Sequence, residues 1–176
     1  MSNQEDVMIY DLYVMNNSGL PVFAGCTVSD FCMSHAEQHP LHTGFIAALQ
    51  SFGREVFSGD IQNLNFPNVK LNLKTSGEYT VVFVNPQSVD NDIINTKLEQ
   101  VSDLFTKKYE KNIKSYAITE KQYTDFVNDV INLGLIPKDR IQSTRAYFVD
   151  DTGEQQEQSS TIFTKFKDKF RSLIKK

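Results

Sequence analysis

The segment 69–85 constrains the fold of this chain more than any other part of its sequence. In VKLNLK (69–74), apolar and polar residues alternate strictly, which predicts a β-strand with one apolar face. TSGE (75–78) has turn chemistry, and YTVVFVN (79–85) is almost wholly apolar. Strands joined by so short a turn pair antiparallel, and a strand that is apolar on both sides needs cover on both faces of its sheet. The segment therefore predicts a hairpin whose second strand lies at the centre of a sheet.

A second hairpin is predicted at the N-terminus by two apolar runs around a short polar turn. VMIYDLYVM (7–15) is rich in β-branched and aromatic residues, and LPVFAGCTV (20–28) follows after NNSG. Pro21 fits the start of an edge strand, where a missing N–H does little harm. A further strand candidate, GDIQNLNF (59–66), stops at Pro67.

Three amphipathic helices are predicted from apolar residues that recur with helical spacing. The first covers 39–57. The second covers 90–109, with Asp90 as its N-cap, and the third opens at Thr119 and ends before Gly134, a natural C′ residue. Their apolar stripes are Phe45, Leu49, Phe52 and Val56; Ile94, Leu98, Val101, Phe105 and Tyr109; and Tyr123, Phe126, Val127, Val130 and Ile131.

The predicted element order is β-β-α-β-β-β-α-α. A short extended run (146–151) follows, and the polar, Gln-rich stretch 150–158 reads as a flexible linker. Because helices of this size need a sheet face to bury against, the order predicts an α+β fold. We expect a five-stranded antiparallel sheet with one helix on one face and two on the other.

This order resembles the longin fold of longin-type trafficking proteins and small adaptor-complex subunits; the roadblock fold is a near relative with a different element order. IYDLYVMNNSGLPVFAG (9–25) resembles the first hairpin of longin-like proteins. HPLHTGFIAALQSFGREVF (39–57) resembles their first helix, which carries small residues and aromatics on its sheet-facing side. YTVVFVN suits their central strand, and the resemblance covers roughly residues 7–135.

The resemblance implies a non-catalytic scaffold without a cofactor. Longin and roadblock domains generally bind other proteins, often small GTPases or one another, and some regulate nucleotide exchange within larger complexes. By analogy, the contact surfaces would be the edge strand around 20–28 and the first helix, and a homodimer is compatible with the resemblance. SNARE-type longin proteins continue into a long coiled-coil segment, whereas only about forty residues follow the last predicted helix here. We therefore do not expect a fusion role.

Composition narrows the class of protein. With 40% hydrophobic residues in 176, the chain can bury a sizeable core without disulfides or a structural metal. Two cysteines six positions apart are no disulfide framework, and the N-terminus does not resemble a signal peptide. No run approaches the roughly 18 apolar residues of a membrane-spanning helix. These features predict a cytoplasmic protein that lies on a membrane at most.

The charge of the chain is divided between an acidic body and a basic end. Residues 159–176 hold five Lys, one Arg and one Asp, so they carry +5 and leave −9 on residues 1–158 of a chain with a formal net charge of −4. An acidic body argues against nucleic-acid binding, which depends on neutralising phosphates. The sequence therefore predicts a domain over 1–149, the linker over 150–158, and a separate basic segment over 159–176.

The basic segment has the pattern of an amphipathic helix. At 100° per residue, its apolar side chains fall within an arc of about 120° and its charged side chains occupy the rest. The apolar residues are Ile162, Phe163, Phe166, Phe170, Leu173 and Ile174. The basic residues are Lys165, Lys167, Lys169, Arg171, Lys175 and Lys176. These twelve are the predicted membrane- or partner-binding residues.

Three partners fit this helix. An anionic membrane surface suits aromatics opposite a Lys-rich face and is the leading interpretation. A hydrophobic groove on another protein is the second, and the acidic body of the chain itself is the third.

All the cysteines and histidines lie within CTVSDFCMSHAEQHPLH (26–42). On a continuous helix, His35, His39 and His42 would share a face that suits zinc. Pro40 disfavours such a helix, and the paired spacing of structural zinc sites is absent. We interpret the stretch as a strand end, a loop and a helix start, with adventitious metal or a functional site as the alternatives.

The leading hypothesis is a longin-like interaction module in membrane trafficking or small-GTPase regulation, held at a membrane by its C-terminal helix. The second is a subunit of a coat, tether or exchange-factor complex whose tail docks on a partner. An enzyme is the third and is not favoured, because the sequence has neither a phosphate-binding glycine loop nor a nucleophile elbow.

Overall fold

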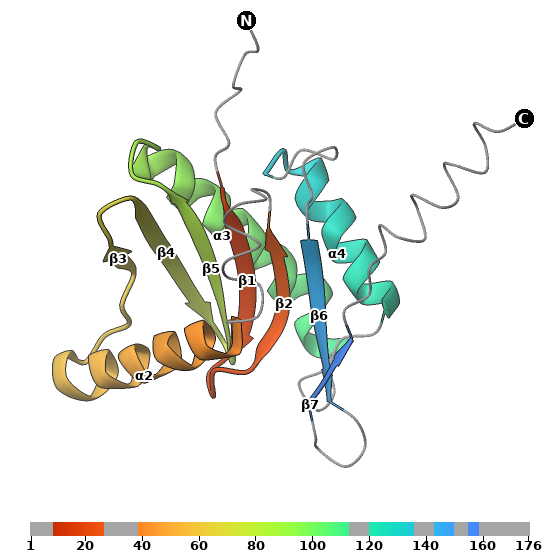
Figure 1. Ribbon diagram of the computed structural model, residues 1–176, viewed down its shortest axis with the longest axis horizontal. Helices are drawn as coiled ribbons and strands as arrows, with labels where there is room; N and C mark the ends of the chain where they lie inside the picture. Colours follow the sequence, from red (N-terminus) through yellow and green to blue (C-terminus); the bar gives the residue numbers. More distant parts are fainter. Residues whose placement is uncertain (1–8, 27–38, 113–119, 136–142, 150–154, 159–176) are drawn as a thin grey trace, which may run out of the picture.

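The computed structural model describes residues 9–26, 39–112, 120–135, 143–149 and 155–158. Over these ranges, seven strands form one sheet in the order β3-β4-β5-β1-β2-β6-β7, and every neighbouring pair is antiparallel (Figure 1). The strands are β1 Asp11–Asn16, β2 Pro21–Cys26, β3 Asn63–Asn65, β4 Val69–Ser76, β5 Tyr79–Pro86, β6 Ser143–Val149 and β7 Gln155–Gln158. The helices are α2 His39–Phe57, α3 Asn91–Lys108, the short 3₁₀ turn η2 Glu110–Asn112, and α4 Glu120–Asn132.

The five predicted strands are confirmed, and they lie next to one another in the sheet. β4 and β5 pair along their full length, from Val69 opposite Pro86 to Ser76 opposite Tyr79, as the alternation of β4 predicts. β5 lies between β4 and β1, and all of it except Pro86 is buried. The β-branched and aromatic residues of β5 therefore face cores on both sides of the sheet.

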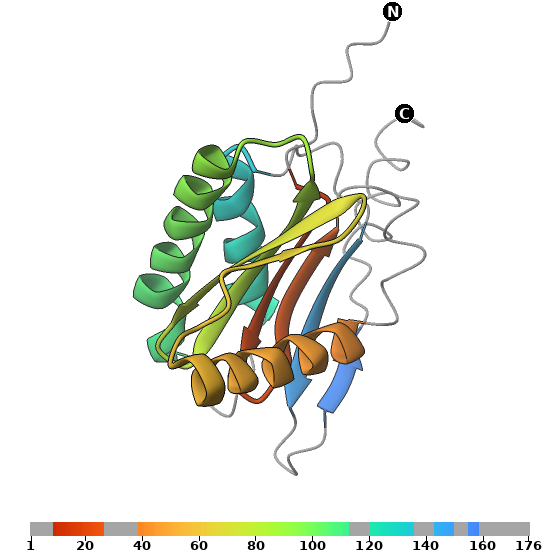
Figure 2. The same ribbon diagram turned by 90° about the vertical axis from the view of Figure 1, so that its left-hand side faces the viewer.

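The helices divide between the two faces of the sheet as predicted. α3 and α4 cover one face, and α2 crosses the other (Figure 2). On the first face, the core joins Phe83 of β5 to Phe105 of α3 and Phe126 of α4, with the last two rings 5.6 Å apart. On the second face, a smaller core joins Tyr13 of β1 and Val82 of β5 to Ile46 of α2.

Local signals in the sequence place the helix ends and one turn. The Asp90 carboxylate accepts hydrogen bonds from the N–H groups of Asp92 and Ile93, so it is the N-cap of α3. Gly134 has φ +71° and follows α4, as expected for a C′ residue. Gly19 has φ +83° in the β1–β2 turn, which the NNSG motif predicted.

The sheet is larger than predicted, and β2 is not an edge strand. β6 pairs with β2, Cys26 opposite Ser143, so residues 143–149 extend the sheet beyond the five expected strands. Residues 155–158, interpreted as part of a linker, form β7 against β6 instead. Backbone pairing explains this difference, because it needs no apolar side chains. In the described part of the chain, the two edges of the sheet are β3 and β7.

Candidate interaction surface

α2 presents two different sides, and its more aromatic side faces away from the sheet. Leu41, Phe45, Phe52 and Val56 are 53–71% exposed, and we call these four residues the outer stripe. Their positions, i, i+4, i+11 and i+15, fall on one side of a helix. Within residues 41–57, the buried residues of α2 include no aromatic side chain: they are Thr43, Ile46, Ala47, Gln50 and Gly53.

The expectation that α2 turns its aromatics toward the sheet is therefore wrong. Helical spacing showed that Phe45, Leu49, Phe52 and Val56 share a side, but periodicity does not say which way that side points. In the structure, Leu49 is half-buried and the other three are exposed. Close backbone approaches and one buried amide determine the orientation instead.

Two glycines allow α2 to lie close to its neighbours. A Cβ added to Gly19 would lie 3.0 Å from the Cβ of Ala47 and 3.0 Å from the Cα of Gly44. A Cβ on Gly53 would lie 2.9 Å from the carbonyl oxygen of Gly59. Larger residues at either position would push away the helix or the chain that follows it.

The chain after α2 is tied back to the helix by polar side chains. The buried Gln50 donates to the carbonyl of Ile61 at 2.8 Å and accepts from its N–H at 2.7 Å. Arg54 pairs with Asp60. These contacts fix the segment that leads into β3.

β3 is a short edge strand near the C-terminal end of α2 (Figure 1). Asn63 and Asn65 are exposed, and Leu64 packs against the smaller core. β3 pairs with β4 on one side, so its other side presents unpaired backbone N–H and C=O groups within the described residues. The described part of the chain therefore offers two candidate surfaces, the apolar outer stripe of α2 and the strand-pairing edge of β3.

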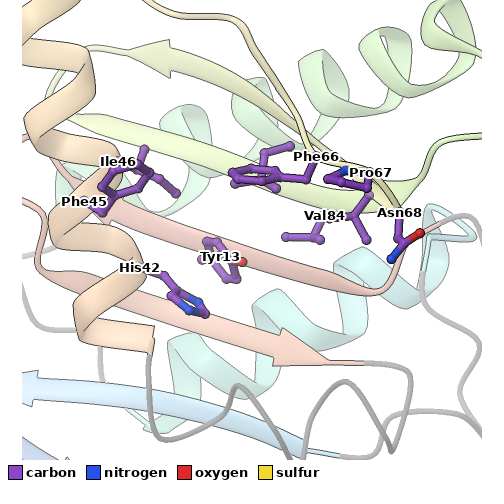
Figure 3. A pocket seen from close by; sticks show the side chains of 10 residues that line it. Tyr13, His42, Phe45, Ile46, Phe66, Pro67, Asn68 and Val84 are labelled. Carbon is purple, nitrogen blue, oxygen red and sulfur yellow. The ribbon is translucent and has the colours of Figure 1, made fainter.

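A hollow of about 460 Å³ lies between α2, the β3–β4 turn and the sheet (Figure 3). Phe45 and Ile46 of α2 form one wall, and Phe66 and Pro67 of the turn form another. Tyr13, Leu71 and Val84 come from the strands beneath. No pattern in the sequence predicts this hollow, because its walls come from segments that are far apart along the chain.

The twelve predicted binding residues of 159–176 lie outside the described residues. The Cys–His stretch is described in part: Cys26 ends β2, and α2 begins at His39, with His42 in its first turn. The predicted start of this helix is therefore confirmed. Across the described ranges, no three His, Cys, Asp or Glu side chains gather closely enough to hold a metal ion. Nor does any described helix have the length and apolar character needed to cross a bilayer.

Comparison with known proteins gives a structural likeness alone. No protein-family model and no curated protein matches the sequence. Among solved structures, a Roadblock/LC7 domain from Streptomyces avermitilis aligns with a TM-score of 0.48 and 12% identity, over 59% of this chain and 88% of that one. MglB of Myxococcus xanthus aligns with a TM-score of 0.49 and 14% identity, over 65% of this chain and 96% of its own. At this distance, the likeness transfers no function.

Proposed function

We propose that this chain is a non-catalytic protein-interaction module of longin or roadblock type, which acts in intracellular membrane trafficking or small-GTPase regulation. The observation that carries this proposal is the outer stripe of α2. An amphipathic helix normally buries its larger apolar side chains, whereas α2 leaves Phe45 and Phe52 more than half exposed. A contiguous exposed apolar surface of this kind is characteristic of an interaction site.

The free energy available from covering the outer stripe is substantial. Fully burying one Val, Leu or Phe side chain is worth about 1.5–3 kcal/mol, so covering the exposed half of four such side chains gives about 3–6 kcal/mol. Part of this free energy offsets the translational and rotational freedom that the two partners lose when they bind. A specific complex therefore needs further contacts, and the free edge of β3 can supply backbone hydrogen bonds.

We take the partner at the outer stripe to be a second copy of the chain. α2 carries one Arg and one Glu, Arg54 and Glu55, and no other Lys, Arg, Asp or Glu, so two copies of this helix meet without like-charge repulsion. A small GTPase is then the partner of the assembled module.

The basic segment supplies the membrane part of the proposal. Residues 159–176 would lie on an anionic membrane with their apolar arc in the interface, at about 1 kcal/mol per basic residue near the surface. β7 brings the folded part to Gln158, so this segment follows the sheet directly. The alternative is a subunit of a coat, tether or exchange-factor complex, with the segment docked on a partner or on its own domain.

Two measurements separate these alternatives. Deleting 159–176 should abolish co-sedimentation with anionic liposomes; unchanged binding after deletion, or none by the full chain, would contradict the membrane role. Small GTPases loaded with GDP or GTP should be captured by the full chain in one nucleotide state. Equal capture in both states, or none, would argue against GTPase regulation and favour the complex-subunit alternative.

A further inference from the structure

The hollow beside α2 is formed by parts of the domain that are themselves held in place. Its floor includes Tyr13 and Val84, which are 2% and 1% exposed, so the sheet beneath is tightly packed. On the β3–β4 turn, the N–H of Phe66 donates to the carbonyl of Val69 at 2.9 Å, and Gln87 donates to the carbonyl of Phe66 at 2.6 Å. Two walls of the hollow are therefore anchored to the sheet and to the β3–β4 turn (Figure 3).

The volume and the mostly apolar lining of the hollow fall in the range of known small-molecule sites. Small-molecule sites enclose about 300–1,000 Å³ and are mostly apolar with a few polar groups, and this hollow holds about 460 Å³. Among the described residues that line it, none is Asp, Glu, Lys or Arg. His42 and Asn68 stand at its borders and the Tyr13 hydroxyl on its floor, so polar atoms are few (Figure 3).

The electrostatics of the floor disfavour an anion. Asp11 is fully buried and lies two residues before Tyr13 on the same face of β1. Burial raises the pKa of the Tyr13 hydroxyl well above its ordinary value, and the charge of Asp11 raises it further. The hydroxyl therefore stays protonated, and a negative group placed over it would meet the same carboxylate.

We propose that this hollow binds an uncharged, predominantly apolar small molecule that carries one polar group. The proposal goes beyond the interaction module described above, because it needs neither a second chain nor a membrane. Phe45 belongs both to the hollow and to the outer stripe, so a ligand here would contact the side chain that a second copy covers.

A pair of dyes tests the charge and the place of binding together. N-phenylnaphthylamine is neutral, and anilinonaphthalene sulfonate has nearly the same ring system with a negative group. Titrating each into the full chain should show fluorescence enhancement by the neutral dye, with an affinity about tenfold higher than that of the sulfonate, which corresponds to 1.4 kcal/mol. Asp11→Asn should narrow this difference.

Filling the hollow provides the matched comparison. Val69 lines the hollow, whereas Val56 lies on the outer stripe and does not, so Val69→Phe and Val56→Phe make the same change in the two places. Val69→Phe should weaken the neutral dye at least about tenfold, and Val56→Phe should leave it within about twofold. Leu71→Phe serves in the same way if Val69→Phe unfolds the protein, as judged by circular dichroism.

The outcomes that overturn the proposal are specific. The proposal is overturned if the neutral dye does not bind, or if the two dyes bind with equal affinity. It is also overturned if Val69→Phe and Val56→Phe lower the affinity for the neutral dye equally. An equal loss would show that the dye is not bound specifically in the hollow. Because dye fluorescence reports binding in the hollow and not the mass of the protein, failure of this site leaves the self-association of α2 to be decided by sedimentation.

Discussion

Gln50 and Ile61 exchange two hydrogen bonds, in which the side-chain amide of a helix takes the place of a neighbouring strand. The Gln50 amide nitrogen donates to the Ile61 carbonyl at 2.8 Å, and the Ile61 N–H donates to the Gln50 amide oxygen at 2.7 Å. Gln50 is 3% exposed. This pair connects the inner side of α2 to the segment that enters β3, and so holds the outer stripe and the sheet edge in one arrangement.

Gln50→Leu should therefore destabilise the domain. Leucine keeps the size of the side chain but leaves the Ile61 N–H and carbonyl without these partners, which we expect to lower the free energy of unfolding by about 1–3 kcal/mol. Urea denaturation measures this change, and hydrogen exchange at the Ile61 amide should quicken. Gln100→Leu, on the exposed side of α3, is the control and should stay within about 0.5 kcal/mol. Equal effects of the two substitutions would contradict this role of Gln50.

Gly19→Ala should cost more stability than Gly134→Ala. Both glycines have positive φ, +83° and +71°, so alanine is strained at either position by about 1–2 kcal/mol. At Gly19, the added Cβ also lies 3.0 Å from Ala47 and Gly44, whereas at Gly134 it meets nothing within 4 Å. The difference between the two losses, measured by denaturation, reports the contact of the β1–β2 turn with α2. Equal losses of unfolding free energy would show that α2 moves away from the added Cβ at no cost.

Tyr109→Phe should destabilise the protein near neutral pH by about 1–2 kcal/mol. The buried Tyr109 hydroxyl donates to Asp129 at 2.6 Å and so joins α3 to α4, while Lys108 donates to the same oxygen at 2.7 Å. The pKa of Tyr109 is raised above its ordinary value near 10, and burial is the largest cause. The hydrogen bond to Asp129 raises this pKa further, and so do the charges of Asp129 and Asp125.

The same substitution has a pH signature with a definite sign. Because the pKa of Tyr109 is raised by folding, its contribution is complete below the unfolded value near 10 and is lost as pH rises above it. Above this pH, the free energy of unfolding of the wild type should fall by up to about 1.4 kcal/mol per pH unit more than that of the phenylalanine variant. Denaturation at pH 8 to 11 should show the gap between the two proteins closing. A gap that stays constant or widens would contradict the assignment.

Much of the fold follows from patterns in the sequence, and the exceptions have physical causes. The stripe Ile94, Leu98, Val101 and Phe105 is buried as predicted, because α3 has a polar opposite side and only one apolar side to bury. α2 has no such contrast: its inner side carries Thr43 and Gln50, so its orientation depends on contacts with distant Gly19 and Ile61.

The two additional strands were predicted only in part. β6 overlaps the extended run expected at 146–151, whereas β7 was missed. β7 is QQEQ, which has no apolar residue, and it pairs through its backbone with β6. The candidate site likewise depends on contacts between residues that are far apart in the sequence. Sequence patterns identified apolar residues on α2, but the outward direction of Phe45 and Phe52, and the hollow above Tyr13, arise only when distant elements meet.

Sedimentation velocity on the full chain tests the central claim, that the outer stripe of α2 takes a second copy. We predict a concentration-dependent species heavier than the 20.1 kDa monomer for the wild type. Phe52→Glu should shift the protein to monomer at the same concentrations and leave its unfolding free energy within about 1 kcal/mol, since Phe52 is 53% exposed. Glu99→Gln, on exposed α3, is the control and should associate like the wild type. A wild type that sediments as a monomer throughout, or a Phe52→Glu variant that associates unchanged, would contradict the account.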